Sequence, residues 1–229
     1  MLRSIPLAVG IWIAVALPVC AADAAYAVKE AKSPLPEGLK EPIAKAMGDR
    51  SFQFVDAKGT LLCELWVRKE VPAKATAEQI KNGLTYRELQ EGTVLGVVQF
   101  PKAITDYRKQ SIKAGVYTLR LGFQPENGDH MGTAPFNEFC LLVPAADDKK
   151  VDPPTGKELQ ELSTKASGTS HPAVLLLFPV PLKDAGGDAK VVDKGEGHWV
   201  LTLKLDLKVG DEKPSLGFGL TLIGVSSGA

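Results

Sequence analysis

The stretch WVLTLKLDLK, residues 199–208, decides the fold class of this chain because apolar and mostly polar positions alternate along it. The apolar set is Trp199, Leu201, Leu203, Leu205 and Leu207. A period of two predicts a β-strand with one face in the core and the other in water. Residues 216–222, LGFGLTL, repeat the pattern, and their two glycines permit a close neighbour.

Further strands are predicted outward from these two. Residues 52–55 and 61–67 form a hairpin across the turn DAKG at 56–59. Other stretches of strand character are residues 94–100, 117–123, 136–143 and 173–178. Eight or nine strands with no strand–helix–strand rhythm predict a mainly β fold, a single antiparallel β-sandwich or jelly-roll-like domain with one or two short helices.

Two helices interrupt this pattern. Thr155 and Glu158 have the spacing of a capping box, and apolar residues follow at helical spacing, which predicts a helix over 155–166. Pro42 suits the first turn of a shorter helix that Gly48 ends. We therefore expect a tether and short helix over 22–48 and the β-sandwich over 49–229.

The first residues predict export. Arg3 precedes an apolar stretch at 5–19, and the small residues Ala21 and Ala22 follow it, which is typical of a secretory signal peptide over 1–21. Cys20 suggests lipidation, but Val19 before it departs from the small residue that lipidation signals prefer. We expect a protein of the periplasm or the extracellular space with no transmembrane span in the mature chain.

Charge excludes some partners. The chain of 229 residues carries 27 basic and 27 acidic side chains, so its net charge supplies no basic footprint for nucleic acid. An apolar fraction of 45% is too high for a disordered chain. The partners expected are an envelope component or a small ligand.

The most unusual stretch is PENGDHMGTAP, residues 125–135, a long link between two predicted strands. Asp129 and His130 lie in it between glycines, and binding sites tend to form on such loops. We therefore take Asp129 and His130 as candidate ligand-binding residues. The alternative is that Asp129 closes a turn and His130 anchors the loop.

A metal site is the related hypothesis. His130, His171 and His198 all fall at strand ends or in loops, and with Asp129 they would form a three-nitrogen, one-oxygen site suited to zinc. None of them has the paired spacing of a short metal motif, so a structural role for each is the alternative. The sequence predicts no cofactor otherwise.

Signals for catalysis are weak. The hydroxyls of residues 167–170 precede His171 without a nucleophile-elbow motif, and Asp147-Asp148 before Lys149-Lys150 is typical of a solvated turn. The sequence therefore favours a protein that is not an enzyme. Trp66 alternates with Glu64 and Arg68, which indicates a surface position suited to stacking on a sugar, or to packing under the 155–166 helix.

Cys63 and Cys140 would share an oxidising compartment after export, which makes a disulfide between them a candidate. Each also lies in an apolar strand, where a free cysteine serves as a small core residue.

Four segments together carry a resemblance: CELWVRK (63–69), IKAGVYTLRLGFQPENGDHMG (112–132), FNEFCLLVPAADD (136–148) and ASGTSHPAVL (166–175). The chain resembles a family of exported bacterial β-rich proteins of unknown function. The resemblance implies export and a β fold, and no activity. We expect a non-catalytic binding or envelope-structural module; the alternative is a metal-binding protein or metal-dependent enzyme that uses the histidines.

Overall fold

The computed structural model describes residues 25–124 and 134–227. It is mainly β, as predicted, and in the described residues eleven strands form one large sheet. The strands in sheet order are β1 (Tyr26–Ala31), β2 (Met47–Asp56), β3 (Leu61–Arg68), β5 (Val94–Phe100), β8 (Gly115–Phe123), β9 (Glu138–Pro144), β10 (Val174–Pro179), β13 (Ser215–Ile223), β12 (Trp199–Lys208) and β11 (Lys190–Asp193). These neighbours are antiparallel, and β4 (Val71–Pro72) makes the sheet mixed because it pairs parallel to β12.

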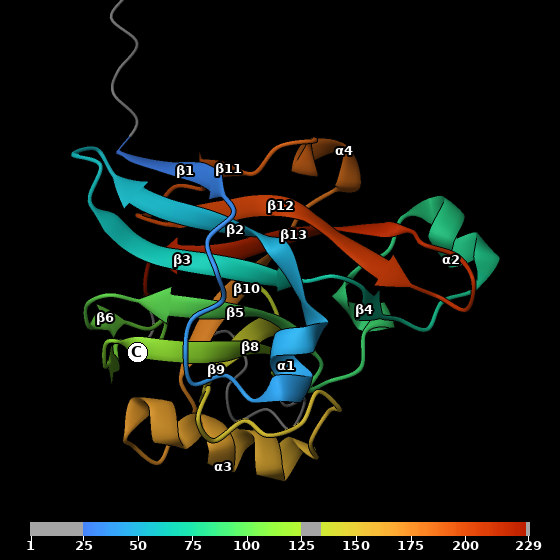
Figure 1. Cartoon of the computed structure of the whole chain (residues 1–229). Coiled ribbons are helices and arrows are strands. Elements are labelled where there is room, and N and C mark those ends of the chain that lie inside the picture. Colours follow the sequence, from blue (N-terminus) through green and yellow to red (C-terminus); the bar gives the residue numbers. More distant parts are fainter. Residues whose placement is uncertain (1–24, 125–133, 228–229) are drawn as a thin grey trace, which may run out of the picture.

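The sheet curls until its first strand, β1, lies beside its last, β11 (Figure 1). At this junction the ring of Tyr26 stacks on Phe54 at 5.2 Å and meets Trp199 edge-on at 5.0 Å between ring centroids. The main apolar core includes side chains from both halves of the sheet, among them Leu65 of β3 and Leu203 of β12. The curl therefore allows one sheet to bury its own inner face.

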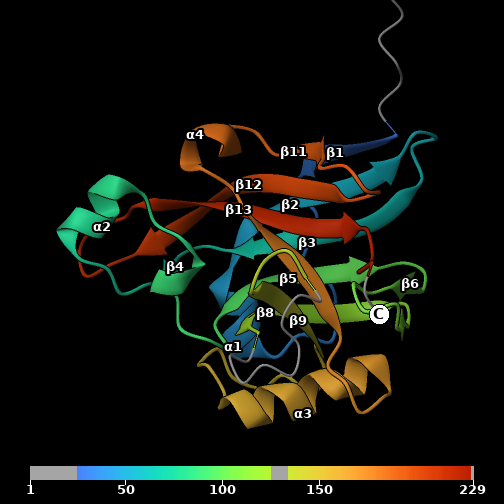
Figure 2. The same cartoon turned by 180° about the vertical axis from the view of Figure 1, so that it is seen from behind.

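Strand β10 joins the two halves of the sheet (Figure 2). Its residues Val174 to Leu176 pair with β9, and Leu177 to Pro179 pair with β13. Because one strand belongs to both halves, the backbone ladder is continuous. The predicted sandwich or jelly-roll form is not confirmed.

Short helices and a second, two-stranded sheet complete the described fold. The helices are α1 (Glu41–Ala46), α2 (Ala77–Asn82), the 3-10 turn η1 (Tyr86–Glu88), α3 (Gly156–Ser167) and α4 (Leu182–Ala185). The small sheet is β6 (Ile104–Thr105) paired with β7 (Ser111–Ile112). None of the helices in the described parts of the chain has the length and apolar character that a membrane-spanning helix needs.

Helix α3 covers the outer face of the sheet at β9 and β10, and the prediction of this helix is confirmed. Thr155 caps it by accepting a hydrogen bond from the backbone N–H of Glu158. Leu159 packs on Leu141 and Leu176. The buried Ser163 hydroxyl is bound to main-chain groups of β9 and of the residue before β10, so helix and sheet are joined by polar as well as apolar contacts.

The N-terminal region differs from the prediction. The short helix is present as α1, with Ile43 and Met47 buried against the outer face of the sheet. The tether expected before this helix, within 22–48, is wrong for Tyr26–Ala31, which form β1 and pair with β2 along their whole length. Those residues are mixed in polarity, and their strand conformation depends on a partner strand about 20 or more residues later in the chain.

Candidate functional site

Strand β8 directs its apolar and polar side chains to opposite faces. Tyr117, Leu119 and Leu121 point into the main core, whereas Thr118 and Arg120 point outward. The connection from β9 to α3, residues 145–155, makes contacts with this outer face through its main chain and Asp148. Thr118 and Arg120 are therefore buried, with 0% and 1% exposed.

The guanidinium of Arg120 binds the carboxylate of Asp148 in a two-pronged ion pair. Nε donates to Oδ2 and Nη2 donates to Oδ1, each at 2.7 Å, and the hydroxyl of Thr118 also donates to Oδ2. Asp148 is 2% exposed. Planar pairing of this kind fixes both position and orientation, and burial strengthens it.

The other N–H groups of Arg120 bind main-chain carbonyls. Nη1 donates to Gly92 and Asp152, and Nη2 donates to Lys150. A guanidinium has five N–H donors, and these contacts use all of them. Arg120 therefore holds the β9–α3 connection in place and has no donor left for a ligand.

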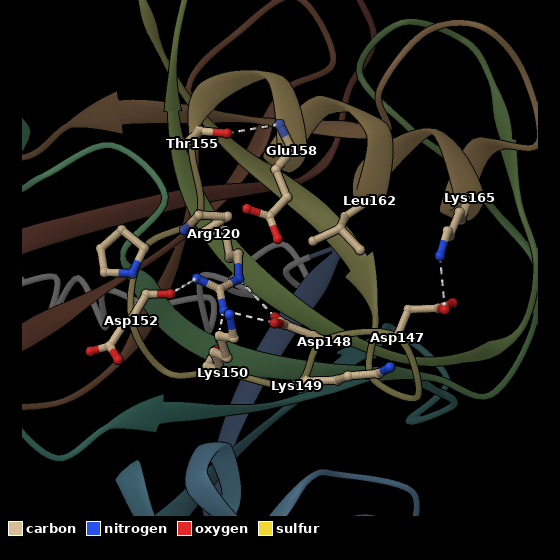
Figure 3. Close-up of a pocket in the computed structure, with 12 residues that line it drawn as sticks. Arg120, Asp147, Asp148, Lys149, Lys150, Asp152, Thr155, Glu158, Leu162 and Lys165 are labelled. Atoms are coloured by element: carbon tan, nitrogen blue, oxygen red, sulfur yellow. Dashed lines mark hydrogen bonds and ion pairs between the residues drawn. The ribbon is translucent and has the colours of Figure 1, made fainter.

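A pocket of about 540 Å³ opens between this connection and one side of α3 (Figure 3). Glu158, Leu162 and Lys165 line the side formed by α3, and Arg120 lies at the base. The remaining lining residues come from the connection, namely Asp147, Asp148, Lys149, Lys150, Asp152, Pro153, Pro154 and Thr155. The pocket is thus formed by α3 and by a connection that Arg120 holds against the sheet.

The charges of the lining balance. Arg120 is paired with Asp148, and Lys165 is paired with Asp147 at 2.9 Å. The lining side chains that make no ion pair with any described residue are two lysines and two carboxylates, Lys149, Lys150, Asp152 and Glu158. All four are exposed, so they are available to a ligand.

Arg68 of β3 does not line the pocket, but its pKa responds to the charges of two lining residues. Burial lowers the pKa of Arg68, the positive charge of Arg120 lowers it further, and the negative charge of Asp152 raises it. Arg120 and Asp152 therefore act on Arg68 in opposite directions.

The lining offers charged groups for binding and little for covalent chemistry. The described lining holds no histidine, cysteine or serine, and the Thr155 hydroxyl is used in capping α3. The amines of Lys149 and Lys150 and the carboxylates of Asp152 and Glu158 suit the recognition of polar ligands.

The predicted histidine cluster is tested only in part. Asp129 and His130 lie outside the described residues. His171 is exposed after α3, and its main-chain groups bind the hydroxyls of Thr169 and Ser167. Within residues 25–124 and 134–227, no group of three or more His, Cys, Asp or Glu residues is placed to hold a metal ion.

His198 is buried among aromatic rings. Its ring centroid lies 5.9 Å from that of Tyr107 and 6.2 Å from that of Phe178. Nδ1 lies 3.3 Å from the carbonyl oxygen of Gly195, and Nε2 has no hydrogen-bond partner among the described residues. Of the two ring nitrogens, Nε2 is thus the one that no described residue engages.

Trp66 was predicted to lie at the surface, and this prediction is wrong. The side chain is 1% exposed and packs with Ile43 and Met47 beneath α1, and not beneath α3. Its Nε1–H donates to the carbonyl of Ser33 at 3.1 Å. Both faces of β3 are covered, so the alternating pattern did not identify a solvent face, and Trp66 is not positioned to stack on a ligand.

The predicted disulfide between Cys63 and Cys140 is absent, because both cysteines are free and buried. Strands β5 and β8 lie between their strands in the sheet. Neighbouring strands are about 4.8 Å apart, and a disulfide requires Cα atoms within about 7 Å. The alternative expectation, that both serve as small core residues, agrees with their place in the main core.

The site that the structure assembles was not among the sequence candidates. Asp148 belongs to the run interpreted as a solvated turn, yet it is buried. One signal was available: Arg120 interrupts the strand YTLRLGF at 117–123, and a charged side chain inside an otherwise apolar strand needs a partner. The identity of that partner, 28 residues later, was not available from spacing.

No family model, curated protein or solved structure matches the chain. The site is therefore interpreted from its own geometry.

Proposed function

We propose that this protein is an exported, non-catalytic binding module that holds a small polar ligand in the pocket between the β9–α3 connection and α3. The observation that carries the proposal is the buried Arg120–Asp148 pair, which fixes one wall of an open pocket lined by side chains of both charges. Export follows from the signal-peptide pattern at 1–21, and the two facing halves of a sandwich-like domain would serve as its scaffold.

Preorganisation supports a binding role. A pocket wall that is already fixed does not have to become ordered when the ligand binds, so binding costs less conformational entropy. The Arg120 contacts hold the main chain at Lys150 and Asp152 in this way. The side chains of Lys150 and Asp152 make no ion pair and are suited to contact a ligand. The guanidinium of Arg120, whose N–H donors are all in use, supports the main chain that carries them.

A ligand screen by thermal unfolding tests the proposal. The exported protein would be screened against amino acids, short peptides, organic acids, sugars and nucleotides. Lys150→Gln should reduce the shift given by a ligand of the pocket that carries negative charge. Lys157→Gln is the matched control, because Lys157 lies on α3 with its amine paired to Glu161 and outside the pocket lining. A shift that survives Lys150→Gln and Glu158→Gln would place the ligand elsewhere.

Export itself is tested by cell fractionation. The processed chain should appear in the periplasm or the medium, and deletion of residues 1–21 should retain it in the cytoplasm. A role confined to envelope structure is the other form of this proposal. It predicts that no ligand of the screen binds and that the protein co-purifies with an envelope component.

A metal-binding function remains the alternative proposal, and the free Nε2 of His198 is the observation that favours it. In this version His130, His171 and His198 with Asp129 would hold one transition-metal ion such as zinc, in a metal-binding protein or a metal-dependent enzyme. Metal analysis of protein prepared without chelator tests it. About one ion per chain, lost in both His198→Ala and His171→Ala, would support this function over the first.

A further inference from the structure

We infer that the ligand of the pocket is a zwitterion of the short-peptide class, with an apolar side chain between a free ammonium group and a free carboxylate. This inference rests on the proposed binding function, since it concerns the same pocket. Three features of the lining carry it: unpaired groups of both charges, apolar side chains on both sides of the pocket, and a main chain that Arg120 fixes.

The unpaired charges set the first requirement. Lys149 and Lys150 lie on the β9–α3 connection, and Glu158 lies on α3, with its carboxylate directed toward the interior of the pocket (Figure 3). A ligand with only negative charge would meet Glu158 and Asp152 unfavourably, and a ligand with only positive charge would meet the lysines. In a ligand that carries both charges, the negative group can contact the lysines and the positive group can contact Glu158. Such an arrangement of charges gives specificity.

The apolar part of the lining sets the second requirement. Leu162 projects from α3, and Pro153 and Pro154 come from the connection. These three side chains have no polar group to offer, so they suit an aliphatic side chain of the ligand. The volume of about 540 Å³ falls within the usual range of small-molecule sites and exceeds what one amino acid needs. A peptide of two or three residues fits these features together.

The fixed main chain defines where two of the charged side chains begin. Arg120 binds the carbonyls of Lys150 and Asp152, so the stems of these two side chains begin from defined positions. Glu158 is held by the capped first turn of α3. Defined starting points limit the range of separations that the flexible side chains can span, and this range would favour the separation of the two termini in a short peptide.

Matched peptide probes test the inference. The probe is the tripeptide alanyl-leucyl-alanine with free ends, compared by calorimetry at pH 7 with its N-acetylated form, its C-amidated form and the doubly capped form. Both termini of the free peptide are charged at this pH. We expect measurable binding of the free peptide, a loss of about fivefold on capping either end, and weaker binding at high salt.

Variants of the pocket assign each end. The double substitution Lys149→Gln and Lys150→Gln should remove the preference for a free carboxylate while retaining the preference for a free amine. Glu158→Gln should do the reverse. Lys157→Gln and Glu161→Gln are the controls, because these residues pair with each other on α3 outside the pocket lining. All of these changes are at exposed positions, so folding should be preserved.

The outcomes separate this inference from the proposed function. If the doubly capped peptide binds as tightly as the free peptide, or if none of these peptides binds while another ligand of the screen depends on Lys150, the zwitterion inference is overturned and the binding function stands. If the pocket variants leave peptide binding unchanged and no other ligand depends on them, both are overturned.

Discussion

Arg120 and Asp148 face each other through two hydrogen bonds of 2.7 Å, with 1% and 2% of their side chains exposed. Removing one partner leaves the other charged and buried, so we expect Arg120→Met or Asp148→Leu to lower the free energy of unfolding by about 3–5 kcal/mol. Urea denaturation measures this. The Arg120→Met/Asp148→Leu double variant should lose less than the sum of the single losses.

The exposed pair in the same pocket is the control for this prediction. Lys165 Nζ and Asp147 Oδ1 are 2.9 Å apart, but half of the Lys165 side chain is exposed. We expect Lys165→Gln to change the free energy of unfolding by less than about 1 kcal/mol. Equal losses at the two pairs would contradict the account of the buried pair.

The hydroxyl of Tyr86 binds the main chain of two paired strands, at the register pair Phe178 and Gly219. It accepts a hydrogen bond from the N–H of Gly219 in β13 and donates one to the carbonyl of Phe178 in β10. Tyr86→Phe leaves both main-chain groups without this partner, so we expect a loss of about 1–3 kcal/mol in denaturant unfolding. Tyr26→Phe, at a half-buried ring of β1, is the control and should cost less.

Gly217 permits a close approach between β13 and the segment before α4. A Cβ at this position would lie 2.0 Å from the carbonyl oxygen of Val180. We therefore expect Gly217→Ala to lower the melting temperature, with a loss of about 1–3 kcal/mol from overpacking. Gly187→Ala is the matched control, because no atom lies within 4 Å of its added Cβ. An unchanged melting temperature for Gly217→Ala would contradict the close contact.

The two buried cysteines predict a reactivity test. Burial raises the pKa of Cys63 to about 12, with a smaller contribution from Glu64, and burial also raises the pKa of Cys140. The thiolate is the reactive form, so neither residue should react with a thiol reagent at pH 8 until the protein is unfolded. Both should then react without a reducing agent. A failure to react in denaturant would indicate the disulfide that the structure lacks.

The raised pKa of Cys63 also predicts how the stability of the fold changes with pH. A thiol whose pKa is higher in the folded than in the unfolded protein stabilises the fold fully below the unfolded value, near 9. This contribution is lost as the pH rises from about 9 toward 12, since the unfolded thiol ionises first. Cys63→Ala should reduce the alkaline part of the loss of stability, as measured by denaturant unfolding at pH 8 and pH 10.5.

The sequence determined the elements of this protein that depend on near neighbours. The alternation in residues 199–208 corresponds to β12, and the cap at Thr155 corresponds to α3. The turn between β2 and β3 is also local, because the Asp56 carboxylate binds the main chain at Lys58 and Thr60. Period, caps and turns are set by contacts of a few residues along the chain, and such contacts can be predicted from spacing.

Only the tertiary structure decided what covers each face and which distant segments meet. Alternation predicted one wet face for β3, but α1 and the Ser33 region cover it, and Trp66 is therefore buried. Asp148 looks like a surface charge in isolation, Arg120 gives no indication of its partner, and the burial of both follows from the path of the β9–α3 connection. These outcomes depend on pairing between residues far apart in the chain, and a periodic pattern carries no information about the partner.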